Sequence, residues 1–179
     1  IDFGAYEMKI VEGKYSKKGI VIDKSFSIDL PKGLYKDGII QDMDQFVYLL
    51  KQGLNDNKVV LGNAYGVINS SDVIVREINI PKVDDNQINS IIQYQLDDFL
   101  PVNPEEYVVN FLKKGAVMDE GVEKIQVMLF GVPKVIIECH FNLLQNVGLK
   151  PMVLDYSGNS IRKLLMSGMR INDSIDITG

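Results

Sequence analysis

The 179-residue sequence is poor in three residue types that often mark a function. It contains no tryptophan, one cysteine (Cys139) and one histidine (His140). A single cysteine excludes an internal disulfide and agrees with a reducing cytoplasm. A zinc site needs three or four ligands and adjacent helix positions point apart, so this pair predicts neither a metal centre nor a catalytic dyad. We expect His140 to be a packing residue or simply exposed.

Long apolar runs and basic runs are also missing. No apolar stretch approaches the ~18–20 residues that cross a bilayer. The 19 basic and 24 acidic residues give a net charge of −5, and basic residues are scattered or paired, as at Lys17-Lys18. Because nonspecific nucleic-acid binding needs clustered Lys and Arg, we expect no nucleic-acid partner. The glycines around Gly62 lack the Gly-Lys-Ser/Thr ending of a Walker phosphate loop.

Hydrophobic alternation predicts several strands. Met8 and Ile10 fall on one side of a strand that follows a turn at Gly4, and a second strand is predicted from Gly19 to Ile28. The Pro- and Gly-containing segment 31–38 predicts a loop without a strand. Further strands are predicted over residues 58–61, 72–80, 107–112, 124–132 and 149–154.

Capping signals predict the helices between these strands. Asp42 precedes Gln45 by three residues, and Asp84 stands in the same relation to Gln87, which is typical of a helix start. A third helix is predicted to begin near Pro133 and end near Gly148, and a fourth covers residues 157–166. The pattern is mixed α/β, with a strand–helix–strand–strand–helix unit between an outer region formed from both ends of the chain.

The candidate for a phosphate site is the Asp2-Phe3-Gly4 turn. Glycine lets a backbone approach a phosphate, aspartate holds a hydrated divalent cation, and lysine neutralises phosphate charge. Such a triplet alone is usually an ordinary strand turn. Its position at the opening of a hairpin favours the functional interpretation, because Lys9 follows Asp2 by seven residues and lies across the turn.

Taken in order, these segments resemble the PilM family of type IV pilus assembly proteins, relatives of the cell-division protein FtsA. Residues 1–9 resemble the family's first phosphate segment, Asp-Ile-Gly-Ser-Ser-Ser-x-Lys. Residues 75–81 resemble a strand ending in an Arg-x-x-x-x-Pro phrase, and Phe99-Leu100-Pro101 resembles a Tyr-Ile-Pro helix stop. Residues 148–151 followed by Leu154-Asp155 resemble a returning strand. The resemblance spans nearly the whole chain.

The resemblance implies an actin-like (ribonuclease H-like) α/β fold. Residues 1–67 and 154–179 would form part of the first subdomain, and residues 68–153 would form the inserted FtsA-like subdomain. The sequence opens on Ile1 without a methionine and ends where a further strand would begin, so we expect it to be trimmed at the start and truncated at the C-terminus.

The resemblance also implies that the full-length protein binds ATP with Mg²⁺ between two lobes. Asp2, Gly4, Ala5, Tyr6 and Lys9 would contact the nucleotide, and Asp2 would hold the metal. Ala5, Tyr6 and Glu7 replace the family's serines, which removes hydroxyl donors and places the Glu7 carboxylate beside the expected phosphates. The rest of the nucleotide site is expected beyond Gly179.

The role that the resemblance implies is a cytoplasmic adaptor at the inner face of the membrane. It would bind the short cytoplasmic N-terminal tail of a bitopic partner, PilN, in a groove between the core and inserted subdomains, a mode that suits an extended peptide. It could also self-associate. The alternatives are an FtsA-like division protein, the cytoplasmic domain of the secretion protein GspL, and a sugar-kinase relative. No catalytic carboxylate or sugar pocket is identified, so at most a weak ATPase is expected.

Overall fold

The computed structural model describes residues 1–16, 19–100 and 102–166, and its centre is a five-stranded mixed sheet. The strand order is β10-β6-β1-β2-β3, in which β1, β2 and β3 are antiparallel and both β6 and β10 run parallel to their neighbours. The bounds are β1 (Asp2–Phe3), β2 (Glu7–Ser16), β3 (Gly19–Asp29), β6 (Asn63–Ile68) and β10 (Lys150–Tyr156). The mixed α/β class predicted from the sequence is confirmed.

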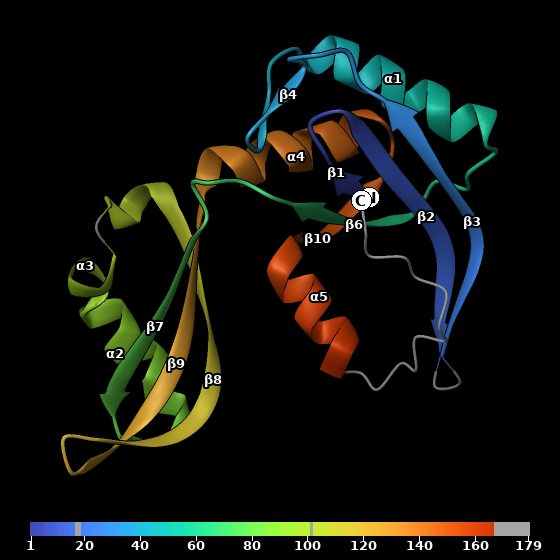
Figure 1. Cartoon of the computed structure of the whole chain (residues 1–179). Coiled ribbons are helices and arrows are strands. Elements are labelled where there is room, and N and C mark those ends of the chain that lie inside the picture. The colour runs from blue at the N-terminus through green and yellow to red at the C-terminus, as the bar shows by residue number, and fades with distance from the viewer. Residues whose placement is uncertain (17–18, 101, 167–179) are drawn as a thin grey trace.

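Two helices, α1 (Met43–Asp56) and α4 (Lys134–Asn146), pack over one face of this sheet. The α1 helix begins as predicted, because the Asp42 carboxylate accepts a hydrogen bond of 2.9 Å from the Gln45 amide. Gly148 ends α4 with a left-handed φ of 87°, which few other residues adopt. The last helix, α5 (Ser157–Met166), lies on the other side of β6 and β10 (Figure 1).

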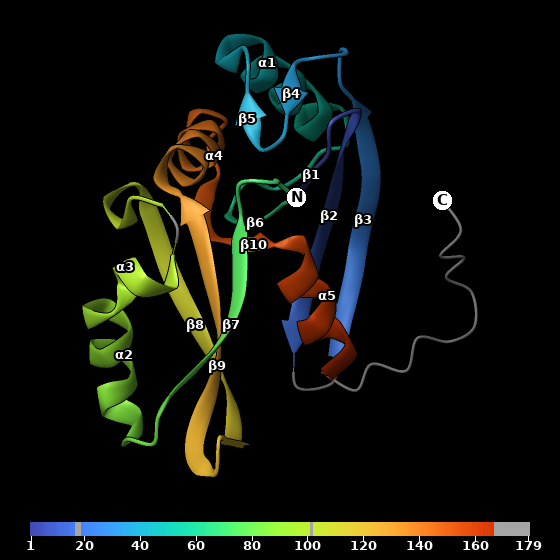
Figure 2. The same cartoon turned by 60° about the vertical axis from the view of Figure 1, so that its left-hand side comes forward.

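A separate three-stranded antiparallel sheet extends from this core. Its order is β7-β9-β8, with β7 (Ile74–Pro81), β8 (Tyr107–Asp119) and β9 (Val122–Pro133). One face is covered by α2 (Asp85–Tyr94) and the short α3 (Leu96–Phe99), and a 3₁₀ turn, Pro104–Glu106, precedes β8. We call β7, α2, α3, β8 and β9 the inserted unit and the remaining elements the core unit. Figure 2 shows the inserted sheet standing beside α5.

The buried side chains form two hydrophobic clusters, one in each unit. The helix α4 contributes Ile136, Leu143 and Leu144 to the cluster of the core unit, all fully buried. The inserted subdomain predicted from the sequence, residues 68–153, includes α4, and this division stays a prediction. In the structure the side chains of α4 pack with Phe3 and Phe46 of the core unit.

Two sequence predictions were wrong in a way that local chemistry explains. Residues 58–61 form no strand, because Lys58 adopts a left-handed φ of 52° and the Val59 amide donates to the Leu54 carbonyl at 2.9 Å, which ends α1. The predicted loop holds a small hairpin, β4 (Tyr35–Lys36) and β5 (Ile39–Ile40). Asp37 and Gly38 both have positive φ and form its two-residue turn.

Among the described residues, no helix is both long enough and apolar enough to cross a membrane.

The two clusters predict that the inserted unit can be destabilised on its own. Leu129 is fully buried in the second cluster, so Leu129→Ala should cost about 2–5 kcal/mol of stability. Hydrogen exchange should then accelerate for amides of β7 and β9 while those of α1 and β2 keep their protection. Equal acceleration in both units would show that they unfold together.

Candidate functional site

A groove of about 560 Å³ lies between the inserted sheet and the start of α5. One wall is formed by the inserted sheet, with Val75 of β7, Met128 and Phe130 of β9, and Leu112, Lys113 and Lys114 of β8. The other wall consists of Tyr156 at the end of β10 and of Gly158, Asn159 and Arg162 of α5. The groove therefore lies where the core unit and the inserted unit face one another (Figure 2).

The sheet wall of the groove is apolar because of strand alternation. Along β9, Val127 and Leu129 are fully buried beneath α2, so Met128 and Phe130 point to the opposite face. The register places Val75 opposite Phe130 and Leu112 opposite Met128, which brings four apolar side chains together. A sheet with one face packed on helices normally exposes polar groups on the other. An apolar second face indicates a surface that another molecule or element covers.

The apolar surface is bordered by charged and polar residues at its far end. Glu77, two residues beyond Val75 on the same face, contacts Lys114 and accepts a hydrogen bond of 2.9 Å from Gln126. An exposed ion pair contributes little to stability, so the effect of Glu77 and Lys114 is mainly to mark the polar border of the groove.

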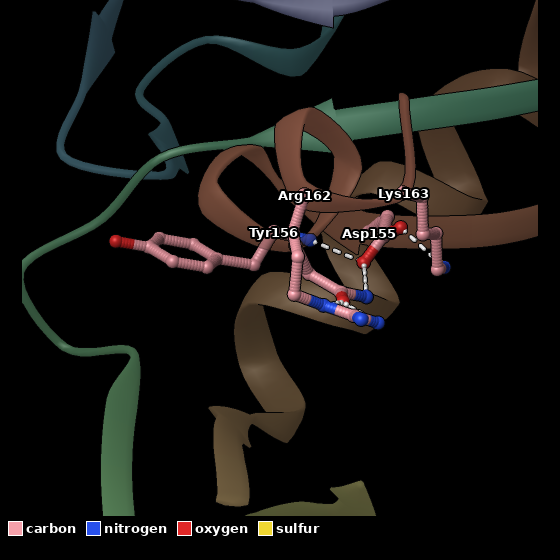
Figure 3. Close-up of polar contacts among 5 residues, drawn as sticks. Asp155, Tyr156, Arg162 and Lys163 are labelled. Carbon is pink, nitrogen blue, oxygen red and sulfur yellow. Dashed lines mark hydrogen bonds and ion pairs between the residues drawn. The ribbon is translucent and has the colours of Figure 1, made fainter. Parts of the chain in front are cut away.

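The helix wall is held in place by Asp155, which lies at the end of β10 and is 18% exposed. One carboxylate oxygen accepts from the Tyr156 amide at 2.9 Å and the Asn159 side chain at 2.8 Å, and the other pairs with Lys163 at 2.7 Å (Figure 3). Burial by itself would raise the pKa of Asp155, but the hydrogen bonds from Lys163 and Asn159 outweigh it and lower that pKa. The ionised Asp155 carboxylate thus fixes the first turns of α5 at neutral pH.

Two further details shape this wall. Asn159 also accepts from the Arg162 guanidinium at 3.3 Å, which orients the arginine at the groove (Figure 3). Gly158 has no side chain, and a Cβ there would lie 2.8 Å from the Tyr156 ring. The glycine therefore lets this ring lie close against the start of α5.

The predicted phosphate turn forms, with the predicted pairing. Asp2 lies opposite Lys9 in the β1–β2 register, and the Gly4 amide donates to the Glu7 carbonyl at 3.1 Å. A Cβ on Gly4 would lie 2.8 Å from that same oxygen, so the tight turn requires glycine. Asp2 and Lys9 are exposed.

The turn fits a nucleotide phosphate only in part. Ala5 and Tyr6 form the exposed tip, with the Tyr6 side chain 76% exposed. The Lys9 ammonium lies 3.3 Å from the Glu7 carboxylate, so part of its positive charge is already neutralised. An exposed Asp2 suits a hydrated Mg²⁺ ion, which prefers oxygen ligands. The described residues contain no cluster of three or more metal-ligating side chains.

His140 is a buried residue that packs against Phe3 of the predicted phosphate turn. Its ring lies 4.7 Å from the ring of Phe3, edge to face. Nδ1 donates to the Ile136 carbonyl at 2.7 Å, since a carbonyl only accepts, and Nε2 then accepts from the Tyr35 hydroxyl at 3.0 Å. Burial lowers the pKa of His140, so the imidazole is neutral in the folded protein.

Comparison with known proteins identifies the family. A family model described as type IV pilus assembly protein PilM matches residues 1–170. The chain belongs to the PilM family. None of the curated protein sequences matches it significantly.

A solved structure shares the fold, as a comparison of the coordinates shows. The structure of a PilM-PilN type IV pilus biogenesis complex matches with a TM-score of 0.75 and 22% identity over 93% of this chain. The chain spans 49% of the matched chain in that complex. The cytoplasmic domain of EpsL, an inner-membrane component of the type II secretion system of Vibrio cholerae, matches with a TM-score of 0.49 and 15% identity, covering 87% of this chain and 54% of that one. The actin-like fold class expected from the resemblance is confirmed.

The predicted site residues lie at the Asp2-Phe3-Gly4 turn and its neighbours, and none of them lines the groove. One signal for the groove was present in the sequence. Residues 127–130 are continuously apolar, which is typical of a strand covered on both faces, whereas a half-exposed strand alternates. The partners of that strand across the groove depend on the tertiary fold.

The neutral His140 predicts a pH dependence of stability. The folded pKa lies below the unfolded value of about 6.5, so the unfolded chain takes up a proton first on acidification. The contribution of His140 to the free energy of unfolding should be constant above pH 7 and fall below pH 6.5, by up to ~1.4 kcal/mol per pH unit. Denaturant titrations between pH 7.5 and 5.5 measure this. His140→Gln keeps a donor and an acceptor but does not titrate, so its loss should be smaller. Parallel curves for the two proteins would contradict the assignment.

Proposed function

We propose that the chain is the front part of a type IV pilus assembly adaptor that binds the cytoplasmic N-terminal tail of a bitopic inner-membrane protein of the PilN kind. The tail lies in the groove between the inserted sheet and α5. In this role the protein works in the cytoplasm, at the inner face of the membrane. The observation that carries the proposal is the groove itself, apolar on the sheet side and bordered by charge.

The groove suits a short extended segment. Its volume of about 560 Å³ lies in the range of sites that take a few side chains. Apolar residues of a peptide would cover Val75, Met128 and Phe130, and its backbone carbonyls would accept hydrogen bonds from the Arg162 guanidinium. The similar solved structure is a complex of PilM with PilN, which agrees with this type of partner.

We also propose that the full-length protein binds ATP with Mg²⁺ at the phosphate turn. Gly4 allows the tight turn that exposes the backbone of Ala5 and Tyr6, and Asp2 offers an exposed carboxylate for the hydrated metal. Lys9 would neutralise phosphate charge once its contact with Glu7 is broken.

The groove proposal is tested by titrating the full-length protein with a peptide copied from the partner's tail. Saturable binding with a Kd below ~100 μM is expected, a generous limit for a segment that orders on binding. Val75 is 44% exposed in the groove, so Val75→Glu should raise the Kd about tenfold or more by placing a charge against the bound apolar residues. Val122→Glu is the matched control, because Val122 is 59% exposed at the far end of β9.

Isothermal titration calorimetry of the three proteins gives the answer. Equal weakening by both substitutions, or no saturable binding by the natural protein, would refute the groove as the peptide site.

The phosphate-turn proposal predicts the effect of restoring a serine. Glu7→Ser removes a carboxylate beside the phosphates and frees Lys9, so ATP affinity of the full-length protein should rise about five- to tenfold, the effect of about 1 kcal/mol. Glu12→Ser is the control, since Glu12 lies farther along β2 and pairs with Lys24. Fluorescent-nucleotide titration in Mg²⁺ measures both. Unchanged affinity in Glu7→Ser would place the nucleotide elsewhere.

A further inference from the structure

The β4–β5 turn contacts the segment that leads from the core unit to the inserted unit. The chain leaves the core unit after β6, through residues 69–73, and returns where β9 leads into α4. The Asp37 carboxylate accepts a hydrogen bond of 2.7 Å from the Ser71 amide and a second bond from the Ser71 hydroxyl. Gly38 packs against α4 of the core unit, because a Cβ built on Gly38 would lie 3.1 Å from the Ile136 side chain.

The geometry of this turn is specific to these two residues. Asp37 has a left-handed φ of 50°, and Gly38, which is buried, has a φ of 85°. A Cβ on Gly38 would also lie 2.9 Å from the Ser70 Cβ, so the turn and the outgoing segment are in close contact. Ser70 is itself buried and its hydroxyl accepts from the Asp72 amide at 3.1 Å, which shapes the outgoing segment.

The groove wall begins immediately beyond this junction. Ile74 pairs with Gly131 at the base of the inserted sheet, and the next pair, Val75 with Phe130, lines the groove. The opposite wall, α5, is fixed to the core unit through Asp155. A small rotation at the junction would therefore move Val75 and Phe130 relative to α5 and change the width of the groove.

We infer that Asp37 is a positioning residue that clamps the outgoing segment and thereby holds the inserted unit at the orientation that keeps the groove open to its peptide. The effect on peptide binding rests on the proposed function, whereas the effect on orientation does not. Asp37 acts through Ser71 and the junction and does not contact the peptide.

The test uses the full-length protein with its native cysteines replaced by serine. Spin labels are attached at Tyr48→Cys in α1 and Tyr94→Cys in α2, whose natural side chains are 65% and 90% exposed. Asp37→Gly removes both hydrogen bonds to Ser71 and suits the positive φ, so the turn itself should still form. Lys58→Gly is the control for this backbone effect, because Lys58 is the exposed residue with a φ of 52° at the end of α1.

Pulsed electron paramagnetic resonance should show a broader distance distribution in Asp37→Gly than in the natural protein or Lys58→Gly, at an unchanged Tm. If the orientation of the inserted unit that binds the peptide falls to about one-fifth of the population, the apparent Kd for the tail peptide rises about fivefold. Asp37→Asn keeps an acceptor for the Ser71 amide, so it should restore most of the natural distance distribution and most of the peptide affinity.

The outcomes separate the two proposals. A broadened distribution together with no peptide binding by the natural protein supports the clamp and refutes the peptide groove. Peptide binding with the same distance distribution and the same Kd in Asp37→Gly as in Lys58→Gly refutes the clamp and supports the groove.

Discussion

The arrangement of this molecule depends on a two-point attachment of one sheet to another. The inserted sheet is joined to the core unit by the start of β7 and the end of β9, which pair with each other at Ile74 and Gly131. Val73 and Val132, on either side of that pair, pack against the core cluster. Because the two connections continue into neighbouring, paired strands, the inserted sheet projects from the core unit as one body. Its α2 face makes a core of its own, and its other face is left opposite α5.

The second requirement is a fixed opposite wall. A short helix at the end of a strand would fray unless its first turn is held, because its first amides have no intrahelical partners. Asp155 meets this need by binding Tyr156, Asn159 and Lys163 together, and it remains ionised because those hydrogen bonds lower its pKa. The groove therefore has one wall built by strand alternation and one held by a carboxylate. Neither wall relies on the phosphate turn, although Phe3 and His140 connect that turn to α4.

Local signals in the sequence predicted most elements correctly. Asp42 with Gln45, and Gly148, marked helix ends that the structure shows, since each works through nearest neighbours in the chain. Asp37-Gly38 is also a local signal for a two-residue turn, but residues 31–38 were predicted as a loop, so the hairpin that contacts the outgoing segment was missed. Residues 58–61 were predicted as a strand, but they form none because the Val59 amide donates to the Leu54 carbonyl at the end of α1. The membership of α4 in the first core, the burial of His140 and the composition of the groove arise from contacts between distant segments, which no local pattern contains.

In the predicted phosphate turn, Asp2 faces Lys9 as expected, and the Glu7 carboxylate contacts the lysine that would neutralise the phosphates. The groove is thus the feature on which the account depends, and site-specific photo-crosslinking tests it most directly. A benzophenone amino acid is placed at Tyr156, which lines the groove, or at Tyr48, which is 65% exposed on α1, in the full-length protein mixed with the partner's tail. The account predicts a crosslink to the tail from position 156 and none from position 48. A tail captured at position 48, or at neither position despite measurable binding, would contradict it.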